Sequence, residues 1–401
     1  MRISKKRCKY CMLLFLLLLL TGCSVGNLDA DKIKEAVKFH QKSEEPEEQE
    51  ITEEQAAFLY GYQNLSADEQ KIYRQLVRGL EGFQEDISLS PVSEEGLEKI
   101  FNRVMIDHPE YFWIEGSFQY YMETWPDGST ADMKVMPDYL MNQEEAEQVQ
   151  AKIEKKAQEW LSGASQEADT YEKIKYVYET LICNVDYEAD SPDNQNIQSV
   201  FLEGRTVCMG YSKATQYLLN KMGIFCTLVT GIASDGAQQG NADTGHAWNL
   251  VKIGDEFYYV DTTWGNPGYS DAQDVGVEIF YSYLCCNEDT LAPTHKANGD
   301  IPLPECRNDG YNYYKNKDCW YETYDRNQIY QVMLQNVSGE HHTTELRFAS
   351  REAYEQAANE MVKGTLLQEA VQNSSQLSPG QQVSWQIYYG GWDNLIVIVW
   401  N

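Results

Sequence analysis

The sequence predicts an α+β fold in which a helix carrying a cysteine packs on an antiparallel sheet carrying a histidine and an aspartate. Three observations predict it. Cys208 directly precedes an amphipathic helical pattern, and His246 lies in an alternating segment typical of a strand. Gly254 and Asp255 then form a predicted two-residue turn into a second strand that ends at Asp261. We expect a helical module before this core and a small α/β module after it.

The predicted hairpin has a definite register. If Ile253 pairs with Glu256, His246 lies opposite Thr263, and Asp261 lies two positions from that partner. Because side chains alternate between the two faces of a sheet, His246 and Asp261 are diagonal neighbours on one face. The sequence therefore predicts contact between the imidazole and the carboxylate.

Cys208, His246 and Asp261 together suit an activated nucleophile. The N-terminus of a helix favours an anion, so the thiolate form of Cys208 is favoured there. Gly204 and Gly210 flank the cysteine and allow close approach of backbone or substrate. A histidine can take the thiol proton while an aspartate orients the ring. Each residue alone also has a structural explanation, so the prediction depends on the set.

The flanking elements follow from capping signals and periodicity. Ser66 and Glu69 form a predicted capping box, and Ser93 precedes a helix that ends near Asp107-His108-Pro109. His108 is interpreted as a structural residue at that helix end. Further segments are predicted from their apolar spacing: strands over 118–124 and 131–136 around a turn at Trp125–Gly128, helices over 142–162, 170–184 and 351–362, and strands over 344–348, 383–389 and 395–400.

Composition excludes several classes of function. The chain has 401 residues, which suits two or three modules, and a formal net charge of −30. Such an acidic chain repels phosphates, so nucleic acid is excluded as a partner. The sequence has no phosphate-binding loop and no zinc-ligand spacing, so we expect no metal and no cofactor. The oligomeric state cannot be deduced.

The N-terminus is typical of an exported lipoprotein. A basic segment, Met1 to Tyr10, precedes the apolar run Cys11 to Leu20, which is too short to span a bilayer. The following Leu20-Thr21-Gly22-Cys23 resembles a bacterial lipobox. That resemblance implies cleavage before Cys23, a lipid on its sulfur, and attachment to the extracytoplasmic face of the cell membrane. Ordinary secretion with cleavage nearby is the alternative.

Once Cys8 and Cys11 of the signal peptide are set aside, six cysteines have no role in the lipid or in the predicted nucleophile: Cys183, Cys226, Cys285, Cys286, Cys306 and Cys319. An exported chain permits disulfides between them, and Cys306 with Cys319 is the first pair to consider because they bracket a short loop. Buried free thiols are an equally good interpretation, especially for Cys226 in an apolar strand.

Three motifs resemble the core of the transglutaminase-like superfamily: Thr206-Val207-Cys208-Met209-Gly210-Tyr211, Gly245-His246-Ala247-Trp248-Asn249 and Tyr259-Val260-Asp261-Thr262-Thr263-Trp264. They occur in the family's order over roughly residues 165 to 270. Asp107–Trp113 also resembles a segment of Firmicute and clostridial lipoproteins of this kind. The resemblance implies a papain-like fold with a Cys208 nucleophile, a His246 base and an Asp261 orienter. It suggests Gln198 as an oxyanion donor, although a polar loop residue is the alternative, and Trp264 as a wall of the site.

These interpretations give five parts: a signal peptide (1–22), an acidic tether (23–54), a mostly helical module with a hairpin (55–145), a transglutaminase-like catalytic domain (146–320) and a small α/β module (321–401). We expect a membrane-anchored cysteine hydrolase or acyltransferase that forms a thioester on surface proteins or cell-wall peptides. Hydrolysis is favoured because water competes well in an open site. The alternative is a non-catalytic lipoprotein that binds peptide or glycan in the same cleft.

Overall fold

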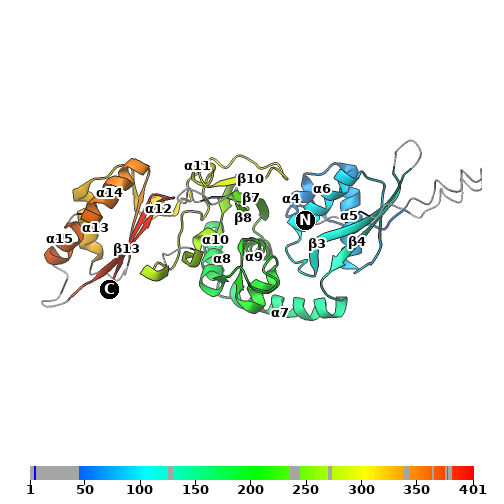
Figure 1. Ribbon diagram of the computed structural model, residues 1–401, viewed down its shortest axis with the longest axis horizontal. Coiled ribbons are helices and arrows are strands. Elements are labelled where there is room, and N and C mark those ends of the chain that lie inside the picture. The colour runs from blue at the N-terminus through cyan, green and yellow to red at the C-terminus, as the bar shows by residue number, and fades with distance from the viewer. Residues whose placement is uncertain are drawn as a thin grey trace, which may run out of the picture. The chain divides into compact units, whose positions relative to one another are not determined.

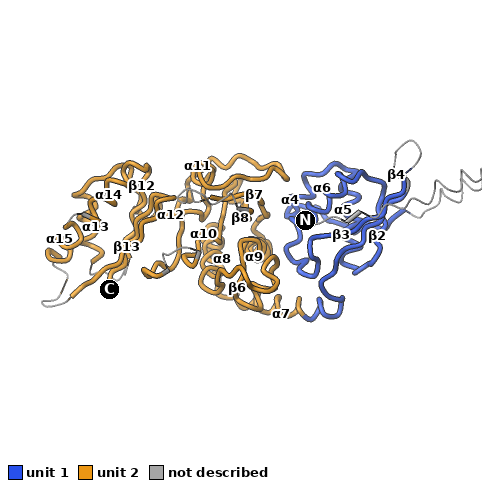
Figure 2. The backbone as a smooth tube through the Cα atoms, in the orientation of Figure 1, with its two compact units in different colours: residues 1–148 blue, residues 149–401 orange. Residues whose placement is uncertain are grey.

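The computed structural model describes residues 4–5, 45–124, 130–234, 244–269, 273–337, 343–363, 365–374, 377 and 382–401. The chain divides into two compact units, residues 1–148 and 149–401 (Figure 2). Cys23, most of the expected signal peptide and the expected turn at Trp125–Gly128 lie outside the described residues. None of the described helices combines the length and the hydropathy that crossing a membrane requires.

The first unit packs helices against a four-stranded sheet of order β1-β3-β4-β2. β3 and β4 form the predicted antiparallel pair. β2 is a short strand that the sequence did not suggest. The elements are α3 (Glu53–Ala56), α4 (Tyr60–Gln63), α5 (Ala67–Glu81), β2 (Ile87–Leu89), α6 (Glu94–Asp107), β3 (Ile114–Thr124) and β4 (Thr130–Tyr139), with β1 at Ser4–Lys5.

The predicted caps of this unit are confirmed, but the predicted tether is shorter than expected. Ser66 and Glu69 form the capping box of α5, and Ser93 caps α6. The acidic segment from residue 45 lies along α5, because Glu48 forms an ion pair with Arg74 at 2.6 Å. An expected tether can therefore extend only to residue 44. A segment rich in acidic residues does not fold by itself. Here the basic side chains of α5 form ion pairs with this segment and fix it against the helix.

The second unit contains the core that carries the predicted site. Its antiparallel sheet has the order β10-β7-β8-β9, and α9 packs against β7 and β8 (Figure 1). This is the α+β core that the sequence predicts. The elements are α8 (Thr170–Asn184), β5 (Asp186–Tyr187), a π-helical turn (Ser199–Glu203), β6 (Arg205–Thr206), α9 (Cys208–Lys221), β7 (Cys226–Ala233), β8 (Thr244–Ile253), β9 (Glu256–Val260), α10 (Thr262–Gly265), α11 (Glu288–Leu291) and β10 (His295–Ala297). α7 (Gln143–Leu161) begins in the first unit and ends in the second.

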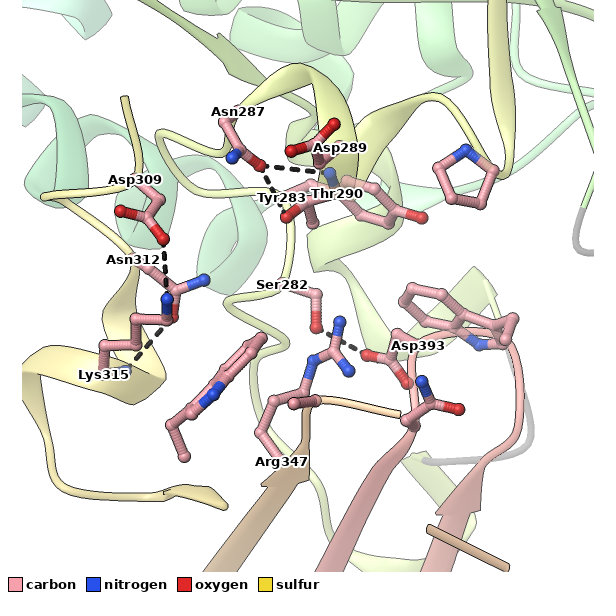
Figure 3. Close-up of a pocket in the computed structure, with 15 residues that line it drawn as sticks. Ser282, Tyr283, Asn287, Asp289, Thr290, Asp309, Asn312, Lys315, Arg347 and Asp393 are labelled. Carbon is pink, nitrogen blue, oxygen red and sulfur yellow. Dashed lines mark hydrogen bonds and ion pairs between the residues drawn. The ribbon is translucent and has the colours of Figure 1, made fainter. Parts of the chain in front are cut away.

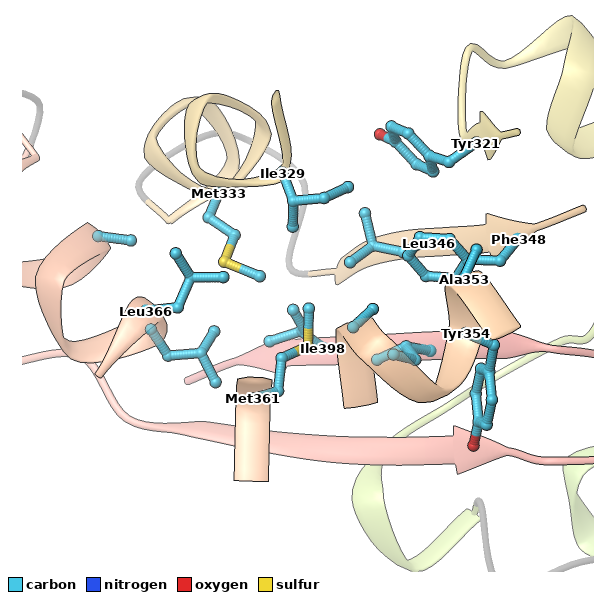
Figure 4. Packing of buried hydrophobic residues seen from close by; sticks show 14 of the residues in the cluster. Tyr321, Ile329, Met333, Leu346, Phe348, Ala353, Tyr354, Met361, Leu366 and Ile398 are labelled. Carbon is cyan, nitrogen blue, oxygen red and sulfur yellow. The ribbon is translucent and has the colours of Figure 1, made fainter. Parts of the chain in front are cut away.

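The C-terminal part is a sheet of order β11-β12-β14-β13 with helices packed on it. Ile329, Leu346, Phe348 and Ile398 are fully buried at its centre (Figure 4). The three predicted strands are present, and the helix predicted over 351–362 is α14, whereas α12, α13 and α15 were not predicted. The elements are α12 (Tyr313–Asn316), β11 (Trp320–Tyr321), α13 (Arg326–Asn336), β12 (Thr343–Phe348), α14 (Arg351–Lys363), α15 (Leu366–Asn373), β13 (Trp385–Gly390) and β14 (Leu395–Trp400).

All the cysteines of the described residues are free thiols. The suggested disulfide between Cys306 and Cys319 is therefore wrong, and the free-thiol interpretation holds. Cys306 is buried, with its thiol directed to the Pro304 carbonyl oxygen at 3.7 Å, while the Cys319 thiol is directed to the Lys317 carbonyl oxygen. Spacing in sequence does not fix the direction in which two side chains point.

Candidate active site

Cys208 is the first residue of α9, as predicted, and it is half-buried. The preceding Val207 has an extended backbone and caps the helix without a side-chain hydrogen bond. The first backbone N–H groups of a helix have no intrahelical acceptor. The Cys208 sulfur therefore lies at a helix end whose dipole favours negative charge.

Buried polar contacts hold α9 in place. Asn249 of β8 donates through Nδ2 to the Ser212 carbonyl oxygen at 2.9 Å, and Thr215 shares a hydrogen bond with Thr262 at 2.9 Å. Near the start of the helix, the Tyr211 hydroxyl accepts from Asn266 Nδ2 at 2.7 Å. These contacts fix the cysteine-bearing turn relative to β8 and α10.

Gly210 is required for the segment before the helix to pack against α9. A Cβ at this position would lie 1.9 Å from Thr206 Oγ1. That hydroxyl bonds to Ser199 at 2.7 Å and donates to the Asn194 carbonyl oxygen at 3.0 Å, so it cannot move freely. The close approach expected at Gly210 is therefore a contact between α9 and the residues just before the helix. Gly204 has φ +66°, a conformation that glycine adopts without strain.

The hairpin that carries His246 has the predicted register. Ile253 pairs with Glu256, and Gly254 has a positive φ of +61° in the turn between them. The expectation that His246 faces Thr263 across the ladder is wrong, because β9 ends at Val260 and the chain turns into α10. This turn still leaves Asp261 on the histidine side of the sheet.

His246 and Asp261 are in direct contact. Their Nε2 and Oδ2 atoms lie 2.7 Å apart, and both side chains are almost completely buried. The other carboxylate oxygen, Oδ1, accepts the backbone N–H of Trp264 at 3.0 Å and so caps α10. Since Asp261 occupies Nε2, Nδ1 is the ring nitrogen left for Cys208, whose thiol is close enough to raise the pKa of His246. The structure thus brings Cys208, His246 and Asp261 together.

A second histidine, which the sequence analysis missed, binds the same carboxylate. His295 Nε2 lies 2.9 Å from Asp261 Oδ2, and its side chain is fully buried. Its Nδ1 lies 2.8 Å from Thr294 Oγ1, which in turn lies 2.6 Å from the Tyr283 hydroxyl. A chain of hydrogen bonds therefore runs from Tyr283 to His246. No local pattern marks His295, because the three-residue β10 reaches the site only by pairing with β7.

The charges of the pair stabilise each other. Burial raises the pKa of Asp261, but the charge and hydrogen bond of His246, and the contacts of His295, hold that pKa well below its usual range. Burial lowers the pKa of His246, but the charge and hydrogen bond of Asp261, followed by the contact with Cys208, raise it well above its usual value. The arrangement favours an imidazolium beside a carboxylate.

The two secondary candidates differ in their placement. The Trp264 ring lies 6.0 Å from the His246 ring and 4.8 Å from the His295 ring, centroid to centroid, so it borders the site. Gln198 instead donates through Nε2 to Asp193 Oδ2 at 2.8 Å. That bond uses one of its two amide N–H groups within the preceding loop, in agreement with the alternative of a polar loop residue.

His246, Asp261 and His295 form the one cluster of the described residues with the composition of a metal site. Their ligand atoms lie within 4.8 Å of one another, but they already form hydrogen bonds of 2.7 and 2.9 Å through one shared oxygen. A metal would have to replace both bonds with its own at about 2.0–2.2 Å. The geometry fits a hydrogen-bonded group better than a metal centre.

Parts of the chain are similar to known proteins. The chain is 24% identical over 137 residues to the kyphoscoliosis peptidase of Mus musculus, covering 32% of this chain and 21% of that protein. It is 28% identical over 118 residues to the Homo sapiens protein of that name, covering 27% and 18%. The chain thus spans about a fifth of the length of these curated relatives.

Two solved structures share a smaller likeness. A crystal structure of a TGase has 13% identity and a TM-score of 0.26, over 39% of this chain and 55% of that one. A protein of Cytophaga hutchinsonii, provisionally assigned as a cysteine protease, has 14% identity and a TM-score of 0.25, over 48% and 79%. The Transglutaminase-like superfamily model matches residues 155–262, which contain Cys208, His246 and Asp261. Residues 155–262 therefore form a transglutaminase-like domain.

Proposed function

We propose that the protein is a cysteine-dependent amide or peptide hydrolase, with Cys208 as nucleophile, His246 as acid and base, and Asp261 as orienting residue. The observation that carries the proposal is the 2.7 Å contact between His246 and Asp261 beside a cysteine at a helix N-terminus. The helix N-terminus favours a thiolate and the Asp261 carboxylate favours an imidazolium, so the two charges are compatible in the resting site. His295 joins them as a positioning residue on Asp261.

The first half of the reaction forms a thioester. The Cys208 thiolate attacks the carbonyl carbon of an amide, and the new C–S bond gives a tetrahedral oxyanion. The backbone N–H of Cys208 is the natural donor to that oxygen, because the helix start leaves it without an intrahelical acceptor. His246 then donates its proton to the amide nitrogen, the C–N bond breaks, and the amine leaves.

The second half releases the acyl group. His246, now neutral, takes a proton from water, and the resulting hydroxide attacks the thioester carbonyl. The C–S bond breaks, which restores the Cys208 thiolate and the His246 imidazolium and releases a carboxylic acid. An amine in place of water would give a cross-link. Two curated relatives are named as peptidases, which supports water as the acceptor here.

The proposal includes export and a lipid on Cys23. Support comes from the sequence alone: a basic start, a short apolar run and Leu20-Thr21-Gly22-Cys23. A lipid there would place the enzyme near surface proteins and cell-wall peptides. Fractionation of cells expressing the wild type and Cys23→Ala tests this. The wild type should sediment with membranes and the variant should not; a variant that stays in the membrane fraction overturns the lipid assignment.

Trapping of the acyl-enzyme tests the reaction. The purified chain is incubated with a panel of peptides and denatured in acid, and intact mass is measured by mass spectrometry. We expect a mass increase equal to an acyl fragment, located on Cys208 and removed by hydroxylamine. Cys183→Ala is the matched control, because Cys183 is an exposed thiol outside the site. An adduct that persists in Cys208→Ala, or cleavage products without any need for Cys208, would contradict the proposal.

A further inference from the structure

A cavity of about 370 Å³ lies between the loops that follow α10 and the C-terminal sheet (Figure 3). One side is formed by residues that follow the catalytic motifs, among them Tyr283 and Asn287, and the other by residues of the C-terminal module, among them Trp320, Arg347 and Trp392. Its volume suits a small ligand. The predicted catalytic residues are not part of its lining.

Arg347 places a buried positive charge in this cavity. Its side chain projects from β12 into the space in Figure 3, and the residue is 9% exposed. Nη1 donates to the Phe348 carbonyl oxygen at 3.0 Å, but no carboxylate of the described residues lies within 4.0 Å of the guanidinium. A guanidinium has five N–H donors, and a buried charge is normally paired. Asp393 of the same lining acts on this charge from beyond that distance, and the other N–H donors of Arg347 have no hydrogen bond among the described residues.

The other charged groups of the lining either have partners within the protein or are exposed to solvent. Lys315 Nζ is paired with Asp309 Oδ2 at 2.6 Å. Asp393 accepts from the Ser282 hydroxyl at 2.5 Å and from the Leu395 backbone N–H. Asp289 is exposed. The lining holds three acids against two bases, so it disfavours a dianion such as phosphate, and any anion in it has to be a single charge bound directly by Arg347.

The aromatic rings of the lining are covered by the protein itself. Lys315 Nζ and the Arg347 guanidinium lie 4.8 and 5.4 Å from the centre of the Trp320 ring. The Trp392 ring stacks on Tyr283 at 5.4 Å with only 6° between the planes. A sugar would need an open aromatic face to stack on, so these rings do not favour one. Amide groups from asparagines of the lining remain to bind a peptide backbone.

From these contacts, we propose that the cavity binds the C-terminal carboxylate of a short peptide, with the carboxylate on Arg347. A planar guanidinium matches a carboxylate through two parallel hydrogen bonds. The inference goes beyond the proposed activity and does not depend on it. Trp264 lies against Trp392 at 5.3 Å, so an aromatic layer separates the cavity from the His246 and His295 rings.

Binding of dipeptides to the full chain carrying Cys208→Ala tests the proposal, because that variant cannot turn over a peptide. Isothermal titration calorimetry compares a panel of dipeptides with free carboxyl ends, the same dipeptides with amidated ends, and inorganic phosphate. We expect the free carboxylates to bind about ten- to hundred-fold more tightly than the amides. This comparison uses an unchanged protein and so does not depend on whether a variant folds.

Arg347→Gln, added to the same background, should remove the preference for the free carboxylate. Arg351→Gln is the matched control, since Arg351 is exposed and paired with Glu355 at 2.8 Å outside the cavity. It should leave the preference unchanged. Equal binding of acids and amides, no binding of any free dipeptide, or phosphate binding as tight as that of the peptides would each overturn the assignment. Failure of the acyl-enzyme experiment would leave this result untouched.

Discussion

His295 Nε2 lies 2.9 Å from Asp261 Oδ2, the oxygen that also contacts His246 at 2.7 Å. One carboxylate thus holds two imidazoles, and the second is anchored from behind by Thr294. This makes the position of Asp261 depend on β10, a strand outside the motifs that define the family.

Replacement of His295 should weaken the site without touching the nucleophile. His295→Phe removes a hydrogen bond to a charged group, so we expect the alkylation rate of Cys208 by iodoacetamide at neutral pH to fall about ten-fold or more. His295→Gln keeps an N–H donor near the position of Nε2 and should recover most of the rate. Mass spectrometry of the Cys208 peptide provides the rate.

A structural role alone would give a different pattern. If both His295 variants lower the melting temperature but leave the Cys208 rate unchanged, His295 supports the fold and does not position Asp261. Proton NMR adds an independent readout, because a buried histidine N–H on a carboxylate gives a strongly downfield resonance. His295→Phe should remove one such signal and shift the one from His246.

Gly210→Ala should destabilise the protein and disturb the start of α9. The added Cβ would meet Thr206 Oγ1 at 1.9 Å, and overpacking of this kind costs about 1–3 kcal/mol in the free energy of unfolding. Urea denaturation measures the loss. Thr206→Ala removes the clashing atom, so the double variant should lose less than the sum of the two single variants.

Gly245→Ala is the matched control, because a Cβ there has no atom within 4 Å and no positive φ opposes it. We expect it to change stability little. Strict additivity of Gly210→Ala and Thr206→Ala would contradict the steric explanation.

The sequence predicted the core well where signals are local. The register of the hairpin followed from one turn, and Ser66 and Ser93 marked their helices through their side chains. His295 escaped notice because a strand of three residues carries no periodicity, and its contact with Asp261 spans 34 positions. The end of β9 was misplaced because Asp261 caps α10, a role that an Asp three residues before a buried Trp264 could have suggested.

Stability should depend on pH through His246. The contacts of Asp261 and Cys208 raise the pKa of His246 in the folded protein above the value of about 6.5 expected when unfolded. Between these two values the folded state binds more protons, so stability falls as pH rises. The stabilisation is complete below about pH 6.5 and is lost as pH rises through the folded value.

Comparison with His246→Gln isolates this effect. Urea denaturation should show the wild type more stable than the variant at pH of about 6, with a smaller difference at pH of about 9. Asp261 does not contribute to the change of stability between these two pH values, because its pKa is held below its usual range and it stays ionised throughout. A difference that stays constant or grows with pH would contradict the raised pKa.

Removal of metal ions should leave the site unchanged. His246, Asp261 and His295 pair with one another, so their arrangement does not require an ion. Dialysis against a chelator should not alter the alkylation rate of Cys208 or the melting temperature. Loss of either on dialysis, with recovery on adding Zn²⁺, would show that the cluster is a metal centre.

The central claim is that Cys208 and His246 act as one ionised pair. The most direct test is the rate of alkylation of Cys208 against pH, read by mass spectrometry in the wild type and in His246→Ala, with the exposed Cys183 as an internal reference. Partial desolvation, followed by the charges of Glu179 and Glu278, raises the pKa of Cys183, so this thiol should react slowly at neutral pH. The account predicts that Cys208 reacts much faster than Cys183 at neutral pH, and that His246→Ala abolishes this difference. If Cys208 follows Cys183 in both proteins, the triad is not assembled and the domain acts as a non-catalytic binding module.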